Sequence, residues 1–127
     1  MLEIWHNPRC SKSRRTLELI QDAGVDVRVR RYLEDAPTPA QLDAALEALA
    51  IEPSQIVRWG EVRAKELHLR DRELSRSEWL ALLSENPILI ERPVVLRDDG
   101  RAVIGRPPES VLELLNQKGR AHTPAGS

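Results

Sequence analysis

Apolar and polar positions along the first third of the chain predict a strand, a helix and a second strand. Leu2 to His6 alternates apolar and polar residues, which predicts a short strand that ends at the Asn7-Pro8 turn. Apolar residues at helical spacing from Ser11 to Asp22 predict a helix, and Gly24 stands where a left-handed C-terminal cap is expected. Val25 to Leu33 alternates again and predicts a second strand. Because crossovers of this βαβ kind are nearly always right-handed, the two strands should be parallel.

The middle of the chain has helical signals. A threonine followed by proline predicts a capped helix over 38–50. Another helix should begin after Ser75 or Ser77 and end before Pro87. Between the two, Ser54 to Asp71 mixes scattered apolar residues with many charges, so we expect short helices there.

The last third predicts a hairpin and a helix. Val94 to Leu96 and Ala102 to Ile104 are β-rich and flank Asp98-Asp99-Gly100, a good signal for an antiparallel turn. Pro107-Pro108 should start a final helix. A polar tail follows over 118–127.

The order of these elements predicts the fold class. A βαβ unit, a helical stretch and a ββα unit are typical of an α/β fold with a mixed sheet flanked by helices. This order matches the thioredoxin-like scaffold with a helical insertion between its two halves. A length of 127 residues corresponds to one domain, which we place at 1–117.

Composition and charge exclude several classes of function. The 19 basic and 20 acidic residues give a net charge of −1, which disfavours a general nucleic-acid-binding protein. No apolar run approaches the roughly 20 residues of a membrane span, and the N-terminus lacks the layout of a signal peptide. We therefore expect a soluble, cytoplasmic protein with no nucleic acid or membrane as partner.

The single cysteine, Cys10, lies where the first strand gives way to a helix. It cannot form an internal disulfide, so it acts as a thiol or with a thiol of another molecule. A lone cysteine is commonly a small buried hydrophobe. The unpaired N–H groups of a helix N-terminus, however, favour a thiolate and also bind oxyanions. This setting favours a reactive Cys10.

Other polar residues surround Cys10 in the sequence. Arg9, Lys12 and Arg14 add positive charge that should lower the pKa of the thiol. His6 could donate a hydrogen bond to the sulfur or to Asn7. No C-x-x-C or H-x-x-x-H cluster and no glycine-rich phosphate loop is present, so we expect no metal and no bound cofactor.

The run from His6 to Arg14, H-N-P-R-C-S-K-S-R, closely resembles the active-site loop of the glutaredoxin-dependent arsenate reductases and their relatives in the ArsC/Spx-like superfamily. The resemblance covers nearly the whole chain. It continues through Thr16 to Ile20, Tyr32-Leu33-Glu34, Asn86 to Ile90, Arg92 to Val95 and Arg106-Pro107.

The resemblance implies a role for particular residues. It makes Cys10 the nucleophile that attacks arsenate, and three arginines the groups that bind the oxyanion. Two of these are Arg92 and Arg106; the third is Arg58, with Arg63 as the alternative. We place His6 with Cys10 among the catalytic residues, and we assign supporting roles to Asn7, Ser13, Arg14 and Pro93. In the thioredoxin-like scaffold the last of these should be a cis-proline facing the cysteine.

A physical argument supports two of the arginines. A residue that precedes proline is driven to extended geometry, so Arg92 and Arg106 should project from loops rather than from helix surfaces. The planar fork of a guanidinium suits a tetrahedral oxyanion.

The implied reaction uses glutathione as co-substrate and glutaredoxin as partner. Arsenate reductases of the family carry glycine and threonine after the cysteine, whereas this chain has Ser11-Lys12, typical of a related subgroup. This departure leaves open which substrate is used. Two alternatives remain: an Spx-type regulator that binds RNA polymerase, and a monothiol glutathione-dependent reductase of another substrate, since Cys10 to Ser13 has the C-x-x-S spacing.

Overall fold

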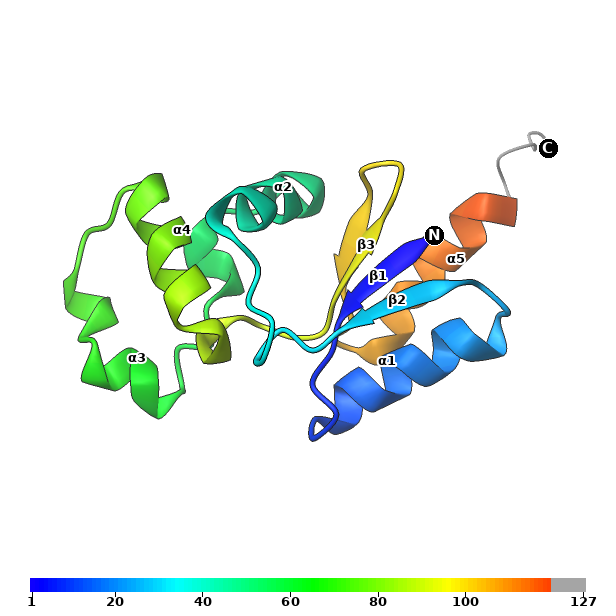
Figure 1. Ribbon diagram of the computed structural model, residues 1–127, viewed down its shortest axis with the longest axis horizontal. Coiled ribbons are helices and arrows are strands. Elements are labelled where there is room, and N and C mark those ends of the chain that lie inside the picture. Colours follow the sequence, from blue (N-terminus) through cyan, green and yellow to red (C-terminus); the bar gives the residue numbers. More distant parts are fainter. Residues whose placement is uncertain (120–127) are drawn as a thin grey trace. The chain divides into compact units, whose positions relative to one another are not determined.

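The computed structural model describes residues 1–119, which form two compact units (Figure 1). Unit 1 combines Met1–Arg31 with the segment that begins at Arg92, and unit 2 is Tyr32–Glu91. Unit 2 is helical and stands in the sequence between the two halves of unit 1. The predicted helical insertion is therefore confirmed.

Unit 1 contains a four-stranded mixed sheet. Its strands are β1 (Leu2–Trp5), β2 (Val27–Arg30), β3 (Val94–Arg97) and β4 (Ala102–Ile104), in the order β2-β1-β3-β4. β1 is parallel to β2 and antiparallel to β3, and β3 is antiparallel to β4. The parallel βαβ unit and the antiparallel hairpin predicted from the sequence are both confirmed.

The second strand is shorter than the alternation over Val25 to Leu33 suggested. Pairing runs from Leu2 opposite Val27 to Trp5 opposite Arg30, and β1 ends there. Because β2 lies at the edge of the sheet, β1 is its only neighbour, and its ladder cannot extend beyond the residues that β1 supplies.

Helices α1 (Ser11–Asp22) and α5 (Leu112–Gly119) pack on one face of this sheet. α1 has the predicted bounds, and Gly24 after it has a φ of +74°, the left-handed geometry expected of a C-terminal cap. Alternate strand residues meet the inner faces of the helices, which gives a core of Leu2, Ile4, Ile20, Val95, Val111 and Leu114.

The predicted final helix is present at the C-terminal end of unit 1. A 3₁₀ turn at Pro108–Val111 leads into α5, which continues to Gly119. The rest of the predicted tail, 120–127, lies outside the described residues. No helix within residues 1–119 is both long and apolar enough to cross a membrane.

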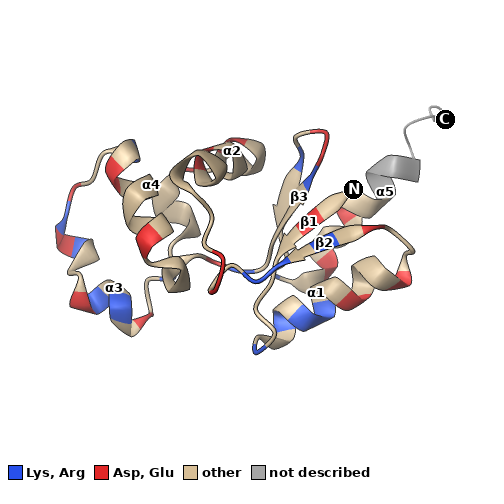
Figure 2. Ribbon diagram, viewed as in Figure 1, with Lys and Arg blue, Asp and Glu red and all other residues tan. Residues whose placement is uncertain are grey.

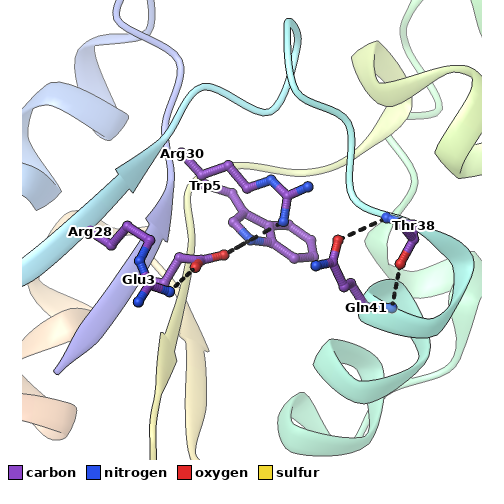
Figure 3. A network of polar contacts seen from close by, with 6 residues as sticks. All are labelled: Glu3, Trp5, Arg28, Arg30, Thr38 and Gln41. Carbon is purple, nitrogen blue, oxygen red and sulfur yellow. Dashed lines mark hydrogen bonds and ion pairs between the residues drawn. The ribbon is translucent and has the colours of Figure 1, made fainter.

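The other face of the sheet carries a polar network around Glu3 (Figure 3). Its carboxylate accepts a hydrogen bond of 2.9 Å from Arg28 and forms an ion pair of 3.8 Å with Arg30. It also accepts a hydrogen bond of 3.0 Å from the indole Nε1 of the buried Trp5. These contacts join β1 to β2, since Arg28 and Arg30 both belong to β2.

Unit 2 contains α2 (Pro39–Leu49), α3 (Val62–Glu66) and α4 (Arg76–Glu85). α2 packs against α4. The predicted short helices between them are present as α3 and two 3₁₀ turns, Pro53–Ile56 and Leu69–Asp71.

Capping boxes begin the two longer helices of unit 2. Thr38 accepts a hydrogen bond from the Gln41 N–H, and the Gln41 side chain accepts one from the Thr38 N–H (Figure 3). Ser75 and Glu78 form the same reciprocal pair at 3.2 and 2.8 Å. The cap is therefore Ser75 and not Ser77, because only Ser75 has a glutamate three residues later.

Close packing at Gly105 connects the end of β4 to α1. A Cβ at this position would lie 2.5 Å from Thr16 Oγ1 and 2.8 Å from Pro93 Cγ. The Thr16 side chain is fully buried and its hydroxyl donates a hydrogen bond of 2.8 Å to the Lys12 carbonyl, so it has little freedom to move away.

Gly105→Ala is accordingly expected to lower the free energy of unfolding by about 1–3 kcal/mol, the usual cost of overpacking a tight site. Urea denaturation measures the change. Gly60→Ala is the control, because a Cβ there meets nothing within 4 Å. Equal shifts in the two variants would contradict the packing argument.

Candidate active site

A short turn places Cys10 at the N-terminus of α1. The Asn7 carbonyl accepts a hydrogen bond of 3.0 Å from the Cys10 N–H, and the Asn7 side chain accepts one of 3.0 Å from the Arg9 N–H. Cys10 is the extended N-cap residue, and its carbonyl accepts the first helical hydrogen bond from the Arg14 N–H. The half-buried thiol therefore lies at the start of a helix, as predicted.

The surroundings of Cys10 lower the pKa of its thiol. Burial alone would raise that pKa, but the Ser13 N–H, the charge of Arg92, the Lys12 N–H and a side-chain contact from Arg92 together outweigh the effect of burial. The Ser13 and Lys12 N–H groups belong to the first turn of α1, at the positive end of the helix dipole, which also favours the thiolate. The side-chain charges of Arg9, Lys12 and Arg14, which the sequence also predicts to act on the thiol, are not among these causes.

The sheet explains why Arg92 reaches Cys10. Trp5 of β1 pairs with Val94 of β3 in antiparallel register. The chain that leaves β1 toward Cys10 and the chain that enters β3 from Arg92 therefore lie at the same end of the sheet.

Arg92 presents hydrogen-bond donors without an acceptor. Its Nε and Nη1 atoms are buried and have no hydrogen-bond partner among the described residues. Leaving a buried donor unsatisfied costs free energy, about 1–3 kcal/mol or more for a charged group. Such donors beside a thiolate are suited to an anion that binds between them.

Arg106 lies next to Arg92. Its Nη1 donates a hydrogen bond of 3.4 Å to the Arg92 carbonyl, and its side chain is exposed. Both arginines precede a proline, and both peptide bonds, Arg92-Pro93 and Arg106-Pro107, are cis. The cis form predicted for Pro93 is confirmed; that of Pro107 was not predicted.

His6 contacts a different partner from those expected. Its Nδ1 lies 2.7 Å from the hydroxyl of Ser13, which also accepts a hydrogen bond of 3.0 Å from the Asn7 N–H. The sequence predicts a hydrogen bond from His6 to the sulfur or to Asn7 instead. Ser13 takes this place because its fully buried side chain points inward from the first turn of α1.

The charge state of His6 follows from its position. Burial lowers its pKa, and the nearby charges of Arg31 and Arg14 lower it further. The imidazole is therefore neutral at neutral pH. With the Asn7 N–H already donating to Ser13, the Ser13 hydroxyl proton is available to bond to the neutral His6 Nδ1.

Arg14 supports the loop from outside. Its Nη1 donates a hydrogen bond of 2.8 Å to the Pro8 carbonyl, so an exposed side chain of α1 connects the helix back to the turn.

The third predicted arginine belongs to unit 2. Arg58 forms ion pairs with Glu61 and, at 3.8 Å, with Glu91, while its N–H donates to the Leu89 carbonyl at 2.7 Å. The alternative, Arg63, bonds to Asn86 at 2.8 Å and pairs with Glu66 at 3.3 Å.

Two residues that shape this site had no role in the sequence analysis. Thr16 and Gly105 bring α1 against the end of β4, directly before Arg106. A single glycine at the end of a strand often marks a close approach of two backbones, so Gly105 could have been identified from the sequence. Thr16 gives no comparable signal.

The lowered pKa makes a prediction about pH dependence. Since the folded protein favours the Cys10 thiolate, alkylation by iodoacetamide should follow a titration curve with a midpoint below that of a free cysteine. The reactive form is lost as pH falls through this midpoint. In Arg92→Ala, the midpoint should move to higher pH, because the charge that favours the anion is removed. An unchanged midpoint in that variant would contradict the assignment.

The arrangement can therefore support nucleophilic attack on a bound oxyanion. A thiolate lies beside unsatisfied guanidinium donors and backbone N–H groups. Within the described part of the chain, no group of three or more His, Cys, Asp or Glu side chains is placed to hold a metal ion.

Comparisons with known proteins show the family of the chain. The sequence model of the ArsC family matches residues 5–114. The chain is 44% identical over 115 residues to the uncharacterized protein YfgD of Escherichia coli K12, covering 90% of this chain and 96% of that protein. It is 41% identical over 113 residues to an arsenate reductase of Haemophilus influenzae, covering 88% and 97%.

A solved structure confirms the fold class. The arsenate reductase from Vibrio cholerae superposes with a TM-score of 0.84 at 43% identity, covering 88% of this chain and 95% of that one. The predicted thioredoxin-like α/β fold is confirmed. Since the family match spans most of the sequence and includes Cys10, Arg92 and Arg106, the chain belongs to the ArsC family.

Proposed function

We propose that the protein reduces arsenate to arsenite through a covalent adduct on Cys10, with glutathione and glutaredoxin supplying the electrons. The observation that carries this proposal is the placement of the Cys10 thiol beside the unsatisfied buried donors of Arg92. Arsenate is a tetrahedral oxyanion that matches such donors. Relatives named arsenate reductase support the same substrate.

In the first step, arsenate binds to Arg92 and Arg106. The Cys10 thiolate attacks arsenic, a sulfur–arsenic bond forms, and one arsenate oxygen leaves as water or hydroxide. Arsenic stays pentavalent in this step. The arginines and the N–H groups of Lys12 and Ser13 stabilise the negative charge as the adduct forms.

In the second step, glutathione thiolate attacks the Cys10 sulfur of the adduct. A disulfide forms between Cys10 and glutathione, the sulfur–arsenic bond breaks, and its electron pair reduces arsenic to the trivalent state. Two thiols lose two electrons in total, and arsenic gains them. Glutaredoxin then takes the glutathione by thiol exchange and releases the Cys10 thiolate.

A thiol from outside the chain is needed because Cys10 is the only cysteine. Ser13, at the second position of the C-x-x-S spacing, is hydrogen-bonded to His6 and Asn7 and cannot form a disulfide. We place the reaction in the reducing environment of the cytoplasm, where such thiols are abundant.

We assign Arg58 rather than Arg63 as the third oxyanion arginine. Arg58 pairs with Glu91, the residue that directly precedes Arg92 in the chain. Arg63 is instead held by Asn86 and Glu66 on a more exposed surface. This contact favours Arg58 because its partner, Glu91, is the neighbour of Arg92 in the sequence.

The test is a coupled assay with glutathione, glutaredoxin, glutathione reductase and NADPH. Arsenate-dependent NADPH oxidation is the expected result. Glutathionylation of Cys10 without any arsenate dependence would favour a monothiol reductase of another substrate. Binding to RNA polymerase with no turnover would favour an Spx-type regulator; either result would overturn the proposal.

A further inference from the structure

Two cations beside Cys10 have no role in the chemistry described so far. Arg9 and Lys12 are both exposed, and neither side chain has an ion pair or hydrogen bond with another described residue. The first turn of α1 contains no acidic residue. Figure 2 shows basic residues on the turn and the start of α1, with acidic residues only farther along the helix.

Neighbouring arginines differ in this respect. Arg14 donates a hydrogen bond to the Pro8 carbonyl, and Arg15 forms an ion pair with Glu18 one helical turn later. Among the Lys and Arg residues of the turn and the first half of α1, Arg9 and Lys12 are thus the two whose side chains have neither an ion pair nor a hydrogen bond with another described residue.

These two charges do not act on the thiol itself. The charge that lowers the Cys10 pKa belongs to Arg92, whereas Lys12 acts through its backbone N–H and not through its side chain. Arg9 directly precedes Cys10 in the turn and Lys12 lies in the first turn of α1, and both side chains are exposed. A reaction partner that brings its own sulfur to Cys10 would place its more distant groups near the side chains of Arg9 and Lys12.

We propose that Arg9 and Lys12 bind the carboxylates of the incoming thiol, so that Cys10 selects anionic thiols and disulfides over neutral or cationic ones. This inference rests on the proposed function, because glutathione carries a carboxylate at each end of a short peptide. Exposed cations attract such a partner over roughly one Debye length and raise its rate of encounter.

The preference of Cys10 for anionic disulfides can be measured without arsenate. In the test reaction, the Cys10 thiolate attacks a small symmetrical disulfide, a new disulfide forms on Cys10, and the old one breaks with its electron pair leaving on a free thiolate. The three reagents are oxidised glutathione, which is anionic, bis(2-hydroxyethyl) disulfide, which is neutral, and cystamine, which is cationic. Mass spectrometry of the intact protein follows each rate.

The informative quantity is the ratio of two rate constants in the same protein. Dividing the rate for oxidised glutathione by the rate for the neutral reagent cancels any change in the thiolate fraction. In Arg9→Gln and Lys12→Gln, this ratio should fall about two- to fivefold per charge, the range typical of exposed ion pairs. The ratio of cystamine to the neutral reagent should rise.

Arg15→Gln is the matched control, since it removes one positive charge from the same helix but from a side chain that is paired with Glu18. Its ratios should stay at the value of the unmodified protein. In the unmodified protein, 0.5 M salt should reduce the preference for oxidised glutathione, because it screens exposed charges.

Ratios that are unchanged in both variants would overturn the inference, and so would a fall of equal size in Arg15→Gln. Because arsenate takes no part in these reactions, a protein that fails to reduce arsenate could still show the selectivity. A protein that reduces arsenate could equally lack it.

Discussion

Cys10→Ser is expected to abolish arsenate-dependent turnover while the fold stays intact. A serine hydroxyl is not ionised at neutral pH, so neither the helix N-terminus nor Arg92 can make it a comparable nucleophile. Serine also cannot form the disulfide through which two electrons reach arsenic. Turnover in the coupled assay should fall to background, and circular dichroism should be unchanged.

Ser11→Ala provides the matched control, because it removes an exposed hydroxyl from the adjacent position of α1. It should keep most of the activity. Mass spectrometry of the unmodified protein after treatment with arsenate and glutathione should show one glutathione on Cys10. Arsenate turnover by Cys10→Ser, or turnover by the unmodified protein with no added thiol, would refute the mechanism.

Local signals in the sequence were sufficient where an element depends on its own residues. α1 begins and ends as predicted, because a turn with proline precedes it and a glycine in left-handed geometry follows it. The choice between Ser75 and Ser77 as helix cap was also available locally, since Glu78 completes a capping box only with Ser75.

Elements that depend on a distant partner were harder to predict. β2 is shorter than its alternation suggested, because the length of β1 limits an edge strand that pairs with β1 alone. The partner of His6 required the position of the inward-facing Ser13 in three dimensions. Helical periodicity does not specify which nearby polar group a histidine will contact.

The site also combines features set by neighbouring residues with features set by distant ones. The position of Cys10 at a helix N-terminus could be predicted from neighbouring residues. The contact between Cys10 and Arg92 spans more than half of the chain and depends on the pairing of Trp5 with Val94. The sequence suggested Arg92 through its resemblance to a family, and the sheet register now gives the physical reason for its position.

Arg92→Ala is expected to reduce kcat/KM for arsenate by tenfold or more. A hydrogen bond to a charged group contributes about 1.5–3 kcal/mol, and each 1.36 kcal/mol corresponds to tenfold in rate. Arg92→Lys should restore only part of the activity, because an ammonium cannot offer the planar pair of donors that Nε and Nη1 present. Arg106→Ala should show a loss of similar size.

Two effects of Arg92 must be separated in this experiment. The variant should also raise the pKa of Cys10, so part of the loss at neutral pH comes from a smaller thiolate fraction. Measuring kcat/KM across a pH series corrects for this. A deficit that remains once Cys10 is fully ionised reports binding of the oxyanion itself. If the deficit disappears at high pH, Arg92 acts only on the thiol, and the assignment of its unsatisfied donors to arsenate is wrong.

The third arginine is tested by comparing Arg58→Ala with Arg63→Ala. Arg58→Ala should lower kcat/KM for arsenate, whereas Arg63→Ala removes an arginine that is already held by Asn86 and Glu66 and is the control.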